Sequence, residues 1–152
     1  MFNLNLSASL NVVRILFKPG LCLPHHTISN FADLPIPLDK ALHSNGHGSA
    51  QVRAVVLDKD DCFAYPDTNE AEKLEAGTGL VVLPHSVKKP GCGDEIMDYF
   101  RKHPETGVTH PSQIAVVGDR LMTDMMLANM MGGWGFWVRD AVAPPEKKSV
   151  SV

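Results

Sequence analysis

The sequence has few cysteines, no long apolar run and no excess of basic charge, and each of these features excludes a class of protein. The 152 residues include three cysteines that lie far apart without CxxC spacing, which indicates neither a disulfide framework nor a zinc site. No apolar run approaches the roughly 18 residues of a membrane-spanning helix, so we expect no transmembrane segment. The formal net charge of −3 and the lack of a basic stripe argue against a nucleic-acid partner.

The composition that remains, with 44% apolar and 20% charged residues, is typical of a globular domain with a real core. We expect three segments along the chain. Residues 1–50 hold an N-terminal amphipathic helix and a Pro-rich connector, residues 51–142 form the main domain, and residues 143–152 form a loose polar tail. The connector covers Leu21 to Pro37 and is followed by a loop from Ser44 to Ala50.

Acidic residues are absent before Asp33, whereas Arg14 and Lys18 supply positive charge in the same segment. The apolar residues there recur at helical spacing, opposite a polar face, and Pro19-Gly20 should end the helix. Two interpretations remain open. The helix contacts a membrane surface through Arg14 and Lys18 or serves in mitochondrial-type targeting, or it packs its apolar face on the domain.

Strand and helix patterns alternate after Gln51, which predicts an α/β fold with a Rossmann-like parallel sheet and flanking helices. The expected strands are Val52–Leu57, Leu80–Leu83, Ile114–Val117 and Gly135–Val138, and the expected helices are Asp94–Lys102 and Leu121–Met131. In such a sheet, ligands bind at the carboxyl ends of the strands. Functional residues should therefore be sought directly after each strand.

Two acidic clusters follow predicted strands. Asp58 and Asp60 come directly after the first strand, and Asp119 and Asp124 come after the third. A carboxylate followed two residues later by another suits phosphoryl transfer: the first attacks phosphorus, and the second protonates the leaving oxygen and later activates water. Carboxylate groups so close together need a cation, and Mg²⁺ held by Asp58, Asp60 and Asp119 fits that need. Gly118 should let the backbone turn tightly beside Asp119.

Lys89 follows the second predicted strand and lies between the acidic clusters in the sequence. A lysine at a phosphoryl site neutralises charge in the transition state. The order of the residues also separates two families that share a doubly wound sheet. In receiver domains the lysine comes last, whereas here it precedes the cluster of Asp119, so the order favours a phosphatase with an aspartate nucleophile.

These residues resemble the motifs of the haloacid dehalogenase superfamily of phosphatases. Asp58-x-Asp60 looks like the first motif, Lys89 like the third, and Gly118-Asp119 with Asp124 like the fourth. The longer segments AVVLDKDDCFAYP, LPHSVKKPGC and IAVVGDRLMTDMMLANMMG are similar to the mitochondrial phosphatidylglycerophosphate phosphatases of fungi and plants. The resemblance also extends to the N-terminal segment, and it covers most of residues 4 to 140.

The resemblance implies hydrolysis of phosphatidylglycerophosphate to phosphatidylglycerol, in the cardiolipin pathway, through an aspartyl-phosphate on Asp58. It implies Asp60 as acid and base, Lys89 on the phosphate, Asp58, Asp60 and Asp119 on Mg²⁺, and Asp124 with Gly118 in support. It further implies a phospholipid substrate at a membrane surface. The enzyme would then be bound peripherally on the matrix side of the inner mitochondrial membrane.

One departure from the family pattern is large. Between its first and third motifs the family has a helix, a strand that carries the second motif, and another helix, whereas this chain has only Ala64 to Gly79. Sixteen residues suffice for one crossover helix. We therefore expect a capless fold shortened by about one strand-helix unit, in which Gly79–Pro84 could move across to pair with the first strand. Ser86 offers a hydroxyl, but its offset from Lys89 belongs to the third motif.

Three functions stay open on the sequence alone. The first is a phosphatidylglycerophosphate phosphatase, in a form whose activity the missing motif places in question. The second is a non-catalytic, truncated relative that binds a membrane or a partner. The third is a phosphatase of the same superfamily that acts on another phosphomonoester, because the catalytic aspartates do not choose the substrate.

Overall fold

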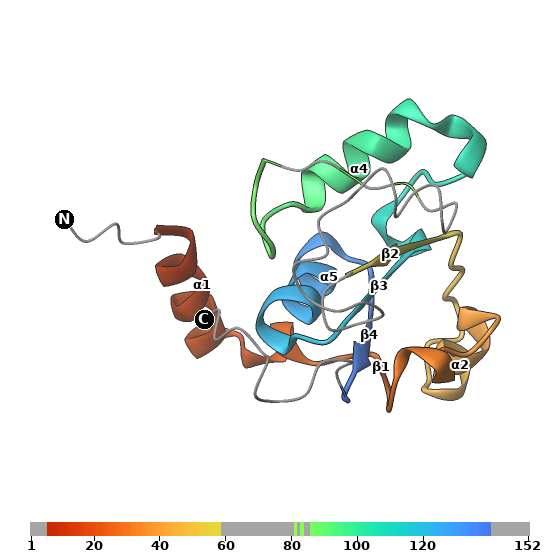
Figure 1. Cartoon of the computed structure of the whole chain (residues 1–152), viewed down its shortest axis with the longest axis horizontal. Helices are drawn as coiled ribbons and strands as arrows, with labels where there is room; N and C mark the ends of the chain where they lie inside the picture. The colour runs from red at the N-terminus through yellow and green to blue at the C-terminus, as the bar shows by residue number, and fades with distance from the viewer. Residues whose placement is uncertain (1–5, 59–80, 82, 84–85, 141–152) are drawn as a thin grey trace.

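The structure is a computed structural model of the whole chain that describes residues 6–58, 81, 83 and 86–140 (Figure 1). Its elements in chain order are α1 (Leu6–Phe17), η1 (Pro19–Cys22), β1 (His26–Ile28), η2 (Phe31–Asp33), α2 (Leu38–Ser44), β2 (Ala54–Leu57), α4 (Gly93–Lys102), η3 (Pro104–Thr106), η4 (Pro111–Gln113), β3 (Ile114–Gly118), η5 (Leu121–Met125), α5 (Met126–Met131) and β4 (Trp134–Val138). The η elements are short 3-10 turns, except η5, which is a π-helical turn.

Four strands form one parallel sheet in the order β1-β4-β3-β2. The central strand β3 is buried along its whole length, as expected for a strand covered on both faces. Its side chains alternate between two cores, because successive residues of a strand point to opposite faces. Ala115 and Val117 enter one core, whereas Ile114 and Val116 enter the other. The predicted α/β fold with a parallel sheet and flanking helices is confirmed.

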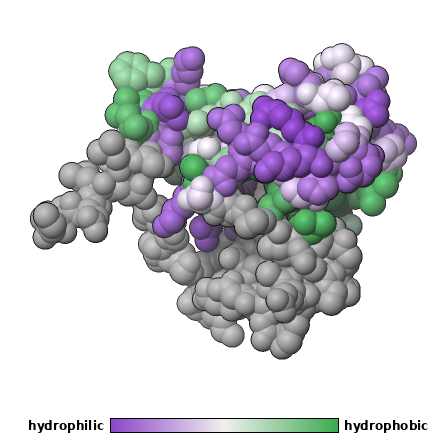
Figure 2. Space-filling view, turned by 90° about the horizontal axis from the view of Figure 1, so that it is seen from above, coloured by the Kyte–Doolittle hydropathy of each residue, from purple (hydrophilic) through white to green (hydrophobic). Residues whose placement is uncertain are grey.

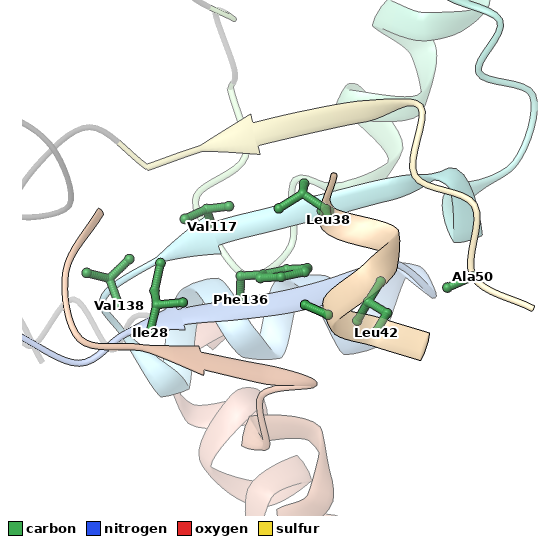
Figure 3. Packing of buried hydrophobic residues seen from close by; sticks show 9 residues of the cluster. Ile28, Leu38, Leu42, Ala50, Val117, Phe136 and Val138 are labelled. Carbon is green, nitrogen blue, oxygen red and sulfur yellow. The ribbon is translucent and has the colours of Figure 1, made fainter. Parts of the chain in front are cut away.

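The first core lies between the sheet and α2. Figure 3 shows Leu38 and Leu42 of α2 facing Val117 and Phe136 on neighbouring strands. Leu42 and Phe136 are fully buried. The N-terminal half of the described chain therefore supplies one covering layer of the sheet.

The second core lies on the opposite face, where α4 and α5 pack. α4 contributes Ile96, Met97 and Phe100, and α5 contributes Leu127 and Ala128. The outer side of α4 carries charged residues and forms the hydrophilic surface seen in Figure 2. The helix predicted at Asp94–Lys102 is thus confirmed as α4 (Gly93–Lys102).

The connector predicted between Leu21 and Pro37 is wrong at residues 26–28. This stretch forms β1, which pairs with β4 in the registers His26 with Phe136 and Ile28 with Val138. The strand has only three residues, and two of them are polar, so it carries no apolar run that a sequence pattern could detect.

Two further predictions are corrected. A strand was expected at Leu80–Leu83. The structure describes Val81 and Leu83 of this stretch, and neither lies in a strand. The described sheet has β1 as its fourth strand instead. The helix expected at Leu121–Met131 divides into the π-helical turn η5 and the short helix α5. The loose tail expected at residues 143–152 lies outside the described residues.

The helix α1 ends at Phe17, before Pro19-Gly20, as the sequence predicted. Most of its described apolar side chains are exposed, and Leu10, Val13 and Phe17 are 55%, 48% and 81% exposed. Figure 1 shows α1 at one end of the long axis of the molecule, beyond the sheet. The interpretation in which α1 buries its apolar face is therefore wrong for the described part of the chain. Within that part, no helix has the length and apolarity to cross a bilayer.

Leu42→Ala tests whether α2 belongs to the folded core. Removing a fully buried leucine side chain should lower the free energy of unfolding by about 2–5 kcal/mol, because apolar burial is lost and a cavity remains. The matched control is Ile36→Ala, at a residue that is 90% exposed, which should change it by less than about 0.5 kcal/mol. Urea unfolding followed by circular dichroism measures both. Equal stability of the two variants would contradict the packing of α2.

Candidate active site

The site lies at the carboxyl ends of the two strands β2 and β3, which pair in parallel. Asp58 follows β2 directly, and its backbone N–H continues the ladder by donating to Val117 O at 2.8 Å. Asp119 follows β3, and its backbone carbonyl accepts a hydrogen bond of 2.9 Å from Trp137 Nε1. Parallel pairing therefore places both aspartates at one edge of the sheet, as the sequence predicted.

Lys89 joins two aspartates that are far apart in the sequence. Its Nζ lies 2.8 Å from Asp58 Oδ1 and 2.6 Å from Asp124 Oδ1. The side chains of Lys89 and Asp58 are 27% and 20% exposed, whereas that of Asp124 is fully buried. An opening to solvent at Lys89 and Asp58 leaves these two groups within reach of a substrate.

Asp124 depends on its partners because it is buried. Its Oδ1 accepts from Lys89, and its Oδ2 accepts from the backbone N–H of Arg120 at 3.1 Å. Burial raises the pKa of Asp124 to about 6, the ammonium of Lys89 opposes that rise, and the charge of Asp58 adds to it. Burial alone would lower the pKa of Lys89, but the carboxylates of Asp124 and Asp58 raise it. At neutral pH, Lys89 is therefore an ammonium held between two carboxylates.

The π-helical turn η5 presents Asp124 to Lys89. The backbone N–H groups of Asp124 and Met125 both donate to Arg120 O, at 2.9 and 3.2 Å. The wider turn this creates is a feature found often at functional sites. It was not predicted, because the apolar spacing of this segment is the same as that of an ordinary α-helix.

Gly118 has a different role from the one expected. It is the last residue of β3 rather than a tight turn, and a Cβ at this position would lie 2.3 Å from Asp124 Cγ and Oδ2. Gly118 therefore leaves space for the buried carboxylate of Asp124.

Three carboxylates form a potential cation site. Oxygens of Asp58, Asp119 and Asp124 lie within 4.8 Å of one another, and carboxylate oxygens are among the ligands that Mg²⁺ prefers. These donors therefore fit Mg²⁺. Asp124 is the least suited as a ligand, because both its oxygens already accept hydrogen bonds. Asp60, the remaining predicted ligand, lies outside the described residues.

The structure thus brings together Asp58, Lys89, Asp119 and Asp124, with Gly118 beside them. It places the predicted membrane residues Arg14 and Lys18 apart from this site, on and just after α1. The sequence interpretation missed Glu95, whose carboxylate accepts hydrogen bonds from the loop that carries Lys89. Acidic residues are common in the first turn of a helix because the helix dipole favours them there. The presence of Glu95 at this position therefore did not indicate a role in the site.

The family model for mitochondrial PGP phosphatase matches this chain in two overlapping parts, residues 6–72 and 66–143. The chain belongs to that family. It is 38% identical to the mitochondrial phosphatidylglycerophosphatase GEP4 of Saccharomyces cerevisiae, over 91% of this chain and 89% of that protein. A probable mitochondrial phosphatidylglycerophosphatase of Schizosaccharomyces pombe is 28% identical, over 82% of this chain and 78% of that protein.

Plant and algal relatives match a smaller part of the chain. Phosphatidylglycerophosphate phosphatase 1 of Arabidopsis thaliana, described as chloroplastic and mitochondrial, is 40% identical over 43% of this chain and 17% of that protein. No solved structure matches the chain.

The comparisons also locate the missing segment. The alignment with the Saccharomyces relative spans 177 positions, more than the 152 residues of this chain, so that relative carries residues that this chain lacks. The two parts of the family match meet at residues 66–72, between Asp58 and Lys89. The break in the family match therefore falls between the first and third motifs, where the missing segment was expected.

Gly118→Ala tests the close packing of Gly118 on Asp124. The added methyl group overlaps the buried carboxylate, so we expect the free energy of unfolding to fall by about 1–3 kcal/mol. Gly48→Ala is the control, because a Cβ there meets nothing within 4 Å. Chemical denaturation of both variants gives the comparison. A Gly118→Ala protein as stable as the Gly48→Ala protein would show that Asp124 does not occupy this space.

Proposed function

We propose that this chain hydrolyses phosphatidylglycerophosphate to phosphatidylglycerol and phosphate through a phosphorylated Asp58, with Mg²⁺ as cofactor. The observation that carries the proposal is the position of Lys89 Nζ, 2.8 Å from Asp58 and 2.6 Å from Asp124, at the sheet edge where Asp119 also lies. The relatives named as phosphatidylglycerophosphatases supply the substrate class.

The proposed reaction has two steps on the same carboxylate. An oxygen of Asp58 attacks phosphorus while the bond to the glycerol oxygen breaks, and Asp60 gives that oxygen a proton. Water then attacks the phosphorus on Asp58 and gives its proton to Asp60, which frees phosphate and restores both aspartates. The ammonium of Lys89 faces the charge that develops on the phosphoryl oxygens.

Asp58 and Asp119, with Asp60, are the proposed Mg²⁺ ligands. When bound, the cation offsets the charge that the carboxylates and the phosphate bring together. Asp124 supports the site by holding Lys89, since its buried carboxylate lies 2.6 Å from Lys89 Nζ.

Asp58→Asn should abolish the activity, because an amide keeps the shape of the side chain but cannot attack phosphorus. The measurement is phosphate release from phosphatidylglycerophosphate in detergent micelles, with and without Mg²⁺. Asp98→Asn is the matched control, since Asp98 is exposed on α4, away from the site. We expect Mg²⁺-dependent release from the unchanged chain and from the control only.

Two results would overturn the proposal. Release that persists in Asp58→Asn would exclude Asp58 as the nucleophile. No release from the unchanged, folded chain would show that the segment missing after Asp58 is indispensable, and that this chain is a non-catalytic relative.

We also propose that the protein acts peripherally on the matrix side of the inner mitochondrial membrane and that α1 contacts the lipid surface. Leu16 and Phe17 are 76% and 81% exposed, and no acidic residue precedes Asp33. Figure 2 shows apolar atoms gathered beside polar ones at the end of the molecule where α1 lies. Such a helix binds anionic lipid by apolar burial and by charge.

A hollow beside α1 supports this contact. It has a volume of about 340 Å³ and joins α1 to α5; its lining residues are Val13, Arg14, Phe17, Lys18, Leu21 and Met130. Four of these side chains are apolar and two are basic, a combination suited to an acyl chain and a phosphate group of one lipid.

Sedimentation with vesicles tests the lipid contact. Arg14→Ala with Lys18→Ala should weaken binding to vesicles with anionic lipid by about 30-fold, because each of the two basic residues near such a surface contributes about 1 kcal/mol. Leu16→Ser with Phe17→Ser should weaken binding to all vesicles, since it removes apolar burial. Ile36→Ser and Lys40→Ala are exposed controls outside α1. If both pairs of changes in α1 left binding unaltered, α1 would not be the contact surface.

A further inference from the structure

The loop that carries Lys89 is held at both ends by the helix α4. At its far end, Cys92 is buried and its carbonyl accepts the backbone N–H of Ile96 at 3.1 Å. Within the loop, the backbone N–H of Gly91 donates to Lys88 O at 2.9 Å. The end of the loop nearer the N-terminus is tied to α4 by a side chain, that of Glu95.

Glu95 accepts three hydrogen bonds from two consecutive residues. Its Oε2 accepts from the backbone N–H of Ser86 at 2.8 Å, and its Oε1 accepts from the backbone N–H of Val87 at 2.7 Å and from Ser86 Oγ at 3.0 Å. Hydrogen bonds to an ionised acceptor are among the stronger ones in proteins. The same contacts engage the hydroxyl of Ser86, which the sequence analysis had considered and disfavoured as a substitute for the second motif.

The position of Glu95 is itself fixed. It lies in the first turn of α4, where a negative charge is favoured by the helix dipole. The next residues, Ile96 and Met97, are buried in the core between α4 and the sheet. Residues 86 and 87 are thus attached to a rigid element, two residues before Lys89.

A lysine side chain needs such support if its ammonium is to stay in one position. Its ammonium sits on a flexible four-carbon chain, and its three donors can turn freely. At this site the ammonium lies 2.8 Å from Asp58 Oδ1 and, at the same time, 2.6 Å from Asp124 Oδ1. Displacement of the loop by about 1 Å can cost about 10²-fold in rate at a catalytic site.

We propose that Glu95 is a positioning residue that clamps the loop of residues 86–91 to α4 and thereby holds the ammonium of Lys89 between Asp58 and Asp124. The catalytic consequence rests on the function proposed above. The structural consequence, a fixed Lys89, does not depend on activity.

The experiment compares Glu95→Ala and Glu95→Gln with Asp94→Ala, which removes an exposed acidic residue from the same helical turn. Acylation of each lysine by acetic anhydride is followed by mass spectrometry. Lys88 and Lys102 are exposed and serve as internal references. We expect Lys89 to react slowly in the unchanged chain and at least about tenfold faster in Glu95→Ala, because the change removes three hydrogen bonds to a charged acceptor and the loss of even one corresponds to about that factor.

Glu95→Gln should give an intermediate rate, because the amide keeps one acceptor oxygen and loses the other. Asp94→Ala should leave the reactivity of Lys89 unchanged. With phosphatidylglycerophosphate as substrate, kcat/KM of Glu95→Ala should fall by about 10²-fold, and Glu95→Gln should recover part of it.

Circular dichroism first establishes that each variant keeps its helices. A folded Glu95→Ala protein whose Lys89 reacts at the rate of the unchanged chain would overturn the clamp. So would an equal effect of Asp94→Ala, which would assign the change to the charge of the helix terminus. If the unchanged chain releases no phosphate, the proposed function fails, whereas the acylation rates still decide the role of Glu95.

Discussion

The ammonium of Lys89 is the only positive side-chain group that the described residues place against Asp58 and Asp124, and the arrangement of the site depends on it. Asp124 is fully buried, and a buried carboxylate without a partner is strongly destabilising. Lys89 meets that need and at the same time approaches Asp58, the proposed nucleophile. The ammonium of Lys89 therefore both stabilises the buried carboxylate of the η5 turn and lies beside the proposed nucleophile at the end of β2. The space left by Gly118 and the wide turn of η5 both serve to bring the carboxylate of Asp124 to this point.

The sequence predicted the parts of the fold that have strong patterns. The strands β2, β3 and β4 each contain a run of apolar residues, and α4 has clear helical spacing. The short elements could not be predicted, because β1 has three residues and α2 has seven, and both depend on contacts with distant parts of the chain. Phe136, for example, packs against α2 and pairs with His26 of β1, but nothing near Phe136 in the sequence indicates either partner.

Much of the candidate site was also predictable, since Asp58 and Asp119 directly follow recognisable strands and parallel pairing brings strand ends together. Lys89 and Asp124 were expected at the same site, but their direct contact was not predicted. Lys89 and Asp124 are 35 positions apart and meet only because of the path of the loop before α4. The contact between Glu95 and residues 86–87 is of the same kind, because hydrogen bonds from a side chain to a loop leave no periodic pattern in a sequence.

The segment that this chain lacks relative to its Saccharomyces relative falls between Asp58 and Lys89, and the described sheet shows why the rest of the fold tolerates that loss. The four described strands are joined by pairs that do not involve this segment: β1 with β4, β4 with β3, and β3 with β2. The N-terminal residues supply β1 and the covering helix α2, so the described residues form a core on each side of β3. Asp58 and Asp119 then keep their places through the β2-β3 pair alone. The hydroxyl of Ser86, which lies three residues before Lys89, is bound to Glu95. Under the function and the clamp proposed above, Lys89 is the described residue that meets the substrate phosphate, so the attachment of its loop to α4 bears directly on catalysis.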